Sequence, residues 1–538
     1  MPPMKRMPTV MRSGHGFSQV PSAQIERSVL DRSHGVKATF DAGYLIPVLV
    51  DPVLPGDTFT VRMTAFCRLT TPIKPLMDNM YLESFFFFVP LRLVWTNFVK
   101  FMGEREPGDV TAYTIPVITV PFTPALHSVY DYMGVMPSGA AGTAGTIAVQ
   151  TPNKVSCLPI RAFYLIYNQW FRDQNLVASV GISLGDGPDS LSQALLKRGK
   201  RHDYFTSCLP FLQKGTASAA AVSAITNIAP YSVPLFRDAV TGLSAGPLER
   251  TAAGAATAVQ INSAGSGAGT DLAWWDPQLQ VDINNLRLAM QIQKLLERDA
   301  RGGTRYTEKI WSHFRVKSPD ARLQRTEYLG GGSTSVVVSP IAQTTQAAAP
   351  SNKDGLANLG AAGAAVASGH GFTKSFTEHG YIIGIVNVRA DLTYQQGIER
   401  DWMKQTLYDM YWPALAHIGE QAVLSQEIYW DGSTAQNAND VSVFGYQERY
   451  AEYRYKPSRI CGLFRSNAAG TIEHWHLSEK FASRPNLGQT FIEDQLTSVL
   501  TNRVAVPAEP DFYGDFYFDM KCARPMPVFG VPGFIDHF

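Results

Sequence analysis

Prolines interrupt the part of the chain whose sequence is most typical of β-strands. Between residues 40 and 89, short β-branched and aromatic runs alternate with prolines at positions 47, 52, 55, 72 and 75. A proline lacks the backbone donor of a helix and clashes with the preceding turn, so no long helix can cross these joins. Residues 58–66 place Phe59, Val61, Met63 and Ala65 on one face, which predicts a half-buried strand. Residues 85–89 are wholly apolar (Phe85, Phe86, Phe87, Phe88 and Val89), which predicts a strand buried on both faces.

The charge content of the 538 residues is low. Charged residues make up 17% of the chain, against ~25% in an average soluble protein, while apolar residues make up 45%. This balance excludes a disordered solubilising protein and indicates surface that is covered, either by the chain itself or by partners. The net charge is +1, so any nucleic-acid contact must come from a local basic surface. Because no stretch approaches the ~20 apolar residues of a membrane span, we expect no membrane insertion.

The domain organisation follows from shifts in composition. Residues 1–37 are basic and aperiodic, which predicts an extended arm, and residues 38–538 read as one domain with insertions. Residues 215–270 and 330–371 are dominated by Gly, Ala, Ser and Thr, which predicts flexible loops or functional insertions. Helical periodicity is confined to three short segments, residues 161–175, 286–300 and 399–410. The fold class is therefore mainly β, with a few short helices.

Catalytic and metal-binding patterns are weak. The chain has none of the common hydrolase, phosphate-loop or calcium-loop motifs, and its five cysteines are widely spaced. His474 and His476 could share a strand face, but metal binding needs a third ligand that the sequence does not supply. Glu448 and Glu452 have the spacing of a helix face, yet a packed aromatic segment with solvated acids explains them as well. We expect no enzyme activity, no metal and no cofactor.

Basic clusters are the strongest functional signal in the residues themselves. Residues 197–201 hold four cations in five positions, followed by Tyr204 and Phe205. Residues 294–325 carry nine Lys or Arg against four acids, with Tyr306, Trp311 and Phe314 between them. Cations for phosphates and aromatics for unstacked bases are typical of single-stranded nucleic-acid binding, and a salt-bridge surface explains the clusters equally well. The candidate DNA-facing residues are Lys197, Arg198, Lys200, Arg201, Arg298, Arg301, Arg305, Arg315 and Lys317.

Long blocks of the sequence resemble one protein family. They are HGFSQVPSAQIERSVLDRS (15–33), FDAGYLIPVLVDPVLPGDTF (40–59), LPIRAFYLIYNQWFRDQNL (158–176), GKRHDYFTSCLPFLQKG (199–215), LRLAMQIQKLLERDARGGTRYTEKI (286–310), EHGYIIGIVNVRADLTYQQG (378–397) and ARPMPVFGVPGFIDHF (523–538). In this order they resemble the major capsid protein of microviruses, in particular of gokushoviruses, which are small bacteriophages with circular single-stranded DNA. The two small-residue segments fall outside the resemblance.

The resemblance implies a fold and an assembly. The fold would be an eight-stranded antiparallel jelly roll whose loops are enlarged by insertions. Self-assembly would give a T=1 icosahedral shell of about 60 copies, by point-group closure. The implied partners are the DNA genome, a small basic DNA-associated protein, an internal scaffolding protein, a pilot protein and a bacterial host receptor. The chain would be a virion component assembled in the host cytoplasm.

We also expect roles for the two chain tails and for the insertion at residues 215–270. Apolar anchors in both tails would lie against neighbouring copies or the inner face: Phe17, Ile25, Val528, Phe529, Phe534 and Phe538. By resemblance, residues 215–270 would form an external three-fold protrusion for host attachment, packed through Leu235, Phe236 and Val240. Residues 330–371 are expected to be a Gly/Ala/Ser-rich loop. Two other interpretations stay open at this point: a carbohydrate-active or carbohydrate-binding β-sandwich, and a free single-stranded DNA-binding protein.

Overall fold

The fold divides the chain into two units. The computed structural model describes residues 26–136, 155–212, 214, 248–250, 259–261, 283–303, 305–317, 319–342, 344, 359–432 and 440–529. Unit 1 comprises Met1–Pro210, Ser318–Pro413 and Ala422–Phe538, and unit 2 comprises Phe211–Lys317 and Ala414–Gln421. No helix among the described residues is both long and apolar enough to cross a membrane.

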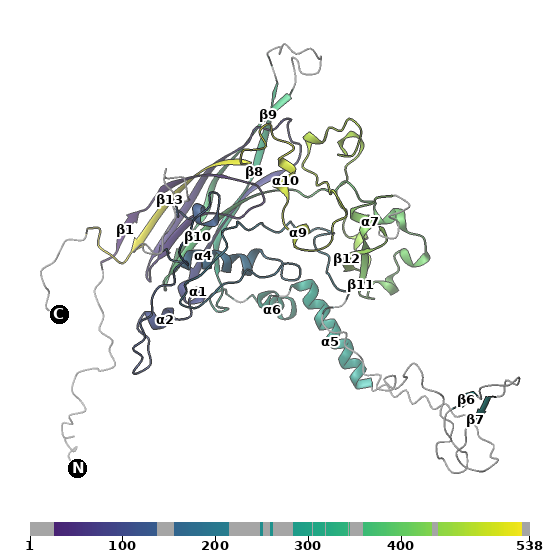
Figure 1. Ribbon diagram of the computed structural model, residues 1–538, viewed down its shortest axis with the longest axis horizontal. Coiled ribbons are helices and arrows are strands. Elements are labelled where there is room, and N and C mark those ends of the chain that lie inside the picture. Colours follow the sequence, from purple (N-terminus) through teal and green to yellow (C-terminus); the bar gives the residue numbers. More distant parts are fainter. Residues whose placement is uncertain are drawn as a thin grey trace, which may run out of the picture. The chain divides into compact units, whose positions relative to one another are not determined.

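One antiparallel sheet of nine strands dominates unit 1 (Figure 1). Its order is β1-β13-β4-β9-β8-β5-β10-β3, and β2 also pairs with β13. The strands are β1 (Ser28–Asp31), β2 (His34–Phe40), β3 (Ile46–Val53), β4 (Thr58–Leu69), β5 (Met80–Pro90), β8 (Glu327–Ala342), β9 (Leu359–Ser375), β10 (Gly380–Ala390) and β13 (Phe512–Arg524). Strand β8 pairs with β5 through its first part and with β9 through its last part, which joins the two halves of a curled sheet. The mainly β, jelly-roll-type fold class is thereby confirmed.

The predicted strands coincide with β4 and β5. Phe59, Val61, Met63 and Ala65 of β4 are buried in the main core, which both halves of the sheet share. Strand β5 is buried on two sides: Phe86 and Phe88 enter the main core, whereas Phe87 and Val89 enter a second core under α4 (Leu158–Ile166). Phe85 is only half-buried. The alternation in β4 and the continuous apolar run in β5 thus reflect one-sided and two-sided burial.

The loop expected at residues 330–371 is wrong for the two ends of this range, and residues 345–358 lie outside the described residues. Residues 330–342 belong to β8 and residues 359–371 to β9, two long paired strands of the sheet. Their glycines permit close strand approach: a Cβ on Gly331 would lie 2.0 Å from the Ser84 carbonyl oxygen, and one on Gly371 would lie 1.9 Å from that of Val61. Within β8 and β9, the small residues therefore serve the close packing of strands.

Apart from the 20-residue helix α5, the remaining elements are short. The helices are α1 (Leu91–Val94), α2 (Phe98–Phe101), α3 (Val129–Tyr132), α4, α5 (Ile283–Gly302), α6 (Tyr306–Phe314), α7 (Ser425–Ile428), α9 (Gln489–Ile492) and α10 (Leu496–Leu500). A π-helical turn (Tyr167–Phe171) continues α4, and six 3₁₀ turns lie at Arg400–Met403, Leu407–Asp409, Pro413–Leu415, Ala451–Tyr453, Gly462–Phe464 and Glu473–Trp475. Two small sheets pair β11 (Glu420–Leu424) with β12 (Val443–Glu448), and β6 (Leu248–Arg250) with β7 (Val259–Ile261).

The predicted helices and the predicted N-terminal arm differ in part from the structure. The helix over 286–300 is confirmed as the longer α5, whereas that over 161–175 ends early in the π-helical turn. The helix predicted over 399–410 is wrong, since this segment forms two separate 3₁₀ turns, Arg400–Met403 and Leu407–Asp409. The Asp409 carboxylate accepts hydrogen bonds from the backbone N–H groups of Gln405 and Thr406, which lie between the two turns, and so interrupts the helix there. The arm predicted over 1–37 already contains β1 and most of β2.

Candidate functional sites

The cations of residues 197–201 are held by internal partners in unit 1. Lys200 is 6% exposed, and its Nζ lies 2.7 Å from Oε2 of Glu479. Lys197 donates to the side-chain oxygen of Gln495 at 2.9 Å, and its ammonium lies over the Tyr44 ring. Both side chains thus have partners within the chain, and for Lys200 that partner completes a buried salt bridge.

Arg198 and Arg201 converge with Arg389 on one carboxylate, that of Glu83. Arg198 contacts Oε2 of Glu83, while Arg201 and Arg389 approach Oε1 at 3.3 and 3.0 Å. Burial alone would raise the pKa of Glu83, but the facing guanidinium groups outweigh it and hold that pKa below its usual range. Arg201 also reaches Asp391 at 3.0 Å. Glu83 thus organises the basic segment from a strand far away in the sequence.

The part of the second basic cluster that lies in unit 2, up to Lys317, combines exposed cations with exposed aromatics. Arg298, Arg315 and Lys317 are exposed, and so are the rings of Tyr306, Trp311 and Phe314. Arg301 is bound to Glu420, and Arg305 lies 3.1 Å from Glu308. The nine candidates therefore divide into a paired set and an exposed set of three. The exposed set has the chemistry of a single-strand contact: charge for phosphates beside rings for bases.

The other candidate ligands and acids are also engaged. His474 hydrogen-bonds the Asn502 carbonyl oxygen at 2.9 Å and His476 that of Phe464 at 2.6 Å, and they lie in or beside a 3₁₀ turn rather than on the expected strand. Glu448 ends β12 and pairs with Arg454, so Glu448 and Glu452 do not share a helix face. Within the described ranges, no group of three His, Cys, Asp or Glu side chains converges as a metal site.

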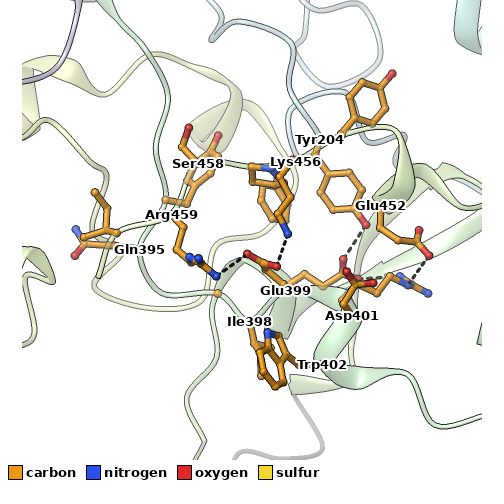
Figure 2. Close-up of a pocket in the computed structure, with 18 of the residues that line it drawn as sticks. Tyr204, Gln395, Ile398, Glu399, Asp401, Trp402, Glu452, Lys456, Ser458 and Arg459 are labelled. Atoms are coloured by element: carbon orange, nitrogen blue, oxygen red, sulfur yellow. Dashed lines mark hydrogen bonds and ion pairs between the residues drawn. The ribbon is translucent and has the colours of Figure 1, made fainter. Parts of the chain in front are cut away.

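A pocket of about 280 Å³ lies in unit 1 beside the 3₁₀ turn Arg400–Met403 (Figure 2). Figure 2 shows Glu399 between Lys456 and Arg459, whose nitrogens are 2.5 and 3.4 Å from its carboxylate oxygens. Sequence reasoning missed this pocket, because its residues come from segments that no shared motif links.

The pocket's second group of charges centres on Arg400. Its guanidinium lies 2.9 Å from Glu427 and 3.9 Å from Glu452. Tyr204 donates its hydroxyl to Glu427 at 2.7 Å, and burial raises the pKa of Glu427 despite Arg400. With its carboxylates bound to cations, the pocket offers shape and apolar surface rather than an acid–base pair.

The tail and insertion candidates are described only in part. Val528 and Phe529 are 58% and 80% exposed, so the described end of the C-terminal tail does not cover its own apolar residues. Phe17, Ile25, Phe534, Phe538, Leu235, Phe236 and Val240 lie outside the described residues.

Comparison with known proteins gives one consistent result. The capsid protein (F protein) family of phages matches residues 18–534. Capsid protein VP1 of Bdellovibrio phage phiMH2K is 42% identical, with 97% of this chain and 98% of that protein aligned. Capsid protein VP1 of Chlamydia phage 1 is 40% identical over 98% and 99%, and that of Spiroplasma virus 4 is 34% identical over 98% and 99%. The chain therefore belongs to the F-protein family of phage capsid proteins.

Proposed function

We propose that this chain self-assembles into a closed T=1 icosahedral shell of about 60 copies around a circular single-stranded DNA genome, the copy number following from point-group closure. Its role is structural rather than enzymatic, as a virion component assembled in the host cytoplasm. Family membership over nearly the whole chain supports this function and favours it over the carbohydrate-binding and free DNA-binding interpretations.

The observation that carries the proposal is apolar surface that the described chain leaves uncovered. Large apolar side chains stand exposed on the sheet (Phe66 and Val366), on α5 (Leu288 and Leu295) and in the C-terminal tail (Phe529). Phe66 and Val366 are cross-strand neighbours on β4 and β9, and subunits of obligate assemblies bury apolar surface of this kind against their neighbours.

Genome contact is the second part of the proposal. Arg298, Arg315 and Lys317 are the best-placed members of the nine candidates, because they are exposed and lie among exposed aromatics. Contacts of this type read charge and stacking rather than base sequence. A small basic DNA-associated protein, an internal scaffolding protein and a pilot protein are the partners that we expect inside the shell.

Host attachment is assigned to residues 215–270 as an external three-fold protrusion. The support is composition: scattered apolar residues in a small-residue insertion can be covered by symmetry-related copies. Replacing residues 217–268 by a short Gly-Ser bridge should leave particles that assemble and adsorb poorly to host cells. Unaltered adsorption would contradict this role.

Sedimentation combined with nuclease digestion tests the shell itself. The purified protein should sediment as a particle of roughly 3.5 MDa, about 60 copies of the chain, and should protect single-stranded DNA from nuclease. A monomer or small oligomer under all assembly conditions would contradict the proposal.

A further inference from the structure

An exposed aromatic surface lies beside the pocket in unit 1. This aromatic patch consists of Trp402, Tyr408, Tyr411, Trp412, Tyr453 and Tyr455, with Leu407 and Met410 among them. Trp402 is 77% exposed and Tyr408 66%, and the other four rings are about half exposed. Trp402 and Tyr455 also line the pocket, and Figure 2 shows Trp402 next to Ile398 at its edge.

Two hydrogen bonds from side chains to backbone carbonyl oxygens fix the conformation of the patch. Trp412 Nε1 donates to the Leu407 carbonyl oxygen at 3.0 Å, across the turn Leu407–Asp409. Arg449 donates to the Tyr408 carbonyl oxygen at 2.7 Å, which ties this turn to the segment after β12. A surface already fixed in one conformation loses little entropy on binding, which favours association.

Ring contacts connect the two halves of the patch. Tyr411 lies 6.2 Å from Tyr453 and 5.1 Å from Tyr450, in edge-to-face geometry. Lys404 lies 4.0 Å over the Tyr453 ring and donates to its hydroxyl. These contacts join the two segments of the patch, residues 402–412 and 450–455, at Tyr453.

Most charges around the patch are bound to one another, and Arg449 donates to a backbone carbonyl oxygen. Asp401 accepts from Lys404 at 2.6 Å, and Glu399 is held between Lys456 and Arg459. Arg400 faces Glu427 and Glu452, and Arg454 contacts Glu448. Such a balanced surface has little attraction for a polyanion, whereas Trp and Tyr with few free charges are typical of protein–protein interface centres.

From these observations we propose that the aromatic patch is an interface with a second copy of this chain. A fully buried aromatic side chain covers ~150–250 Å². Since the six rings are on average a little more than half exposed, together they leave roughly 600 Å² of surface uncovered. This is most of the ~800 Å² that each partner contributes to a standard interface. The proposal rests on the proposed function, since a shell supplies the second copy, and it assigns one surface to that contact.

Thiol labelling tests the proposal without depending on assembly yield. Four of the five cysteines are buried, and burial raises the pKa of Cys67 and Cys157 to about 12, so only Cys461 is exposed to a maleimide reagent. In the double variant Cys461→Ser with Met410→Cys, which keeps all six rings of the patch, position 410 should label at least tenfold more slowly in particles than in dissociated protein. Equal rates in both states would overturn the proposal. Protection in DNA-filled particles but not in empty ones would overturn it too, because nucleic acid would then be the cover.

Substitutions give the second measurement. Trp402→Ala and Tyr408→Ala should each reduce the particle fraction in a sedimentation gradient at least fivefold, and Trp402→Phe should retain most of it. Val110→Ala is the control, since Val110 is 92% exposed and lies outside the patch. Particle yields equal to the parent in both alanine variants would overturn the patch and leave the proposed function intact. Absence of particles from the parent itself would instead overturn the proposed function.

Discussion

Lys200 and Lys317 belong to the two basic segments but occupy opposite environments. Lys200 is buried against Glu479, whereas Lys317 is exposed. Removing one partner of a buried ion pair costs about 3–5 kcal/mol, because the other charge stays buried. Lys200→Ala should therefore lower the free energy of unfolding by that amount in urea titrations, and Lys317→Ala should leave it unchanged. Equal stability of the two variants would contradict the internal role of Lys200.

For DNA binding, we expect the exposed cations to matter. Arg315→Gln with Lys317→Gln should reduce the slope of log affinity against log salt by about 0.7 for each phosphate that the variant no longer neutralises. The measurement is a salt titration of single-stranded DNA binding with variant and parent protein. Identical slopes would remove these residues from the genome contact.

Asp511 predicts a pH dependence of stability. Its carboxylate accepts the Ala42 N–H at 3.0 Å, and burial raises its pKa to about 6. Because the unfolded carboxyl titrates near ~3.9, the folded state binds the proton more tightly. The free energy of unfolding should therefore fall as pH rises from about 4 to 6, by about 3 kcal/mol from this group.

Asp511→Asn should flatten this change, which urea unfolding at pH 4, 5, 6 and 7 would measure. Asp109→Asn is the control, because hydrogen bonds from Thr111 and Tyr113 hold the pKa of Asp109 at about 2, below this range. A slope in Asp511→Asn equal to that of the parent would contradict the assignment.

At the scale of elements, the β8–β9 hairpin depends on glycine. A Cβ on Gly371 would lie 1.9 Å from the Val61 carbonyl oxygen, whereas the nearest atom to a Cβ on Gly360 is 3.8 Å away. Gly371→Ala should force β4 and β9 apart and strongly lower the melting temperature. Gly360→Ala, in the same strand, should be neutral or slightly stabilising. Similar melting temperatures for the two variants would contradict the close strand approach.

Strand β5 supplies a matched test of burial. Phe87 is 1% exposed in the second core, and Phe66 of β4 is 52% exposed. Phe87→Ala should cost ~3–5 kcal/mol through reduced transfer energy and a cavity. Phe66→Ala should cost far less in the unassembled protein. Urea unfolding of both variants distinguishes these outcomes.

These elements show how far the sequence can predict the fold. Strands β4 and β5 are visible because side-chain burial imposes an alternating or continuous apolar pattern on them. Strands β8 and β9 have no such pattern, because neighbouring backbone atoms lie so close to them that only small residues fit. Likewise, the partners of residues 197–201 lie at positions 83, 391 and 479, which only the fold brings near.

At the scale of the whole molecule, the family and the jelly-roll class were predictable because long sequence blocks carry the resemblance. The aromatic patch was not predictable, because aromatic residues in a sequence are usually buried and only the structure shows that these are exposed. Surfaces between copies are therefore the part of this protein that the sequence reveals least.

The C-terminal tail gives a prediction about the assembly. Deleting residues 526–538 removes the exposed Val528 and Phe529 but spares Arg524, which is paired with Asp57 at 2.7 Å. The deletion should leave the melting temperature of the unassembled chain unchanged and lower particle yield in a sedimentation gradient. Unchanged yield would remove the tail from the contacts between copies.

The central claim is that this chain closes into a shell. Electron cryo-microscopy of the purified, assembled protein tests it most directly, because symmetry and copy number come from the same images. The account predicts icosahedral particles of about 60 copies, as point-group closure requires. Particles without icosahedral symmetry, or only monomers and small oligomers, would contradict it.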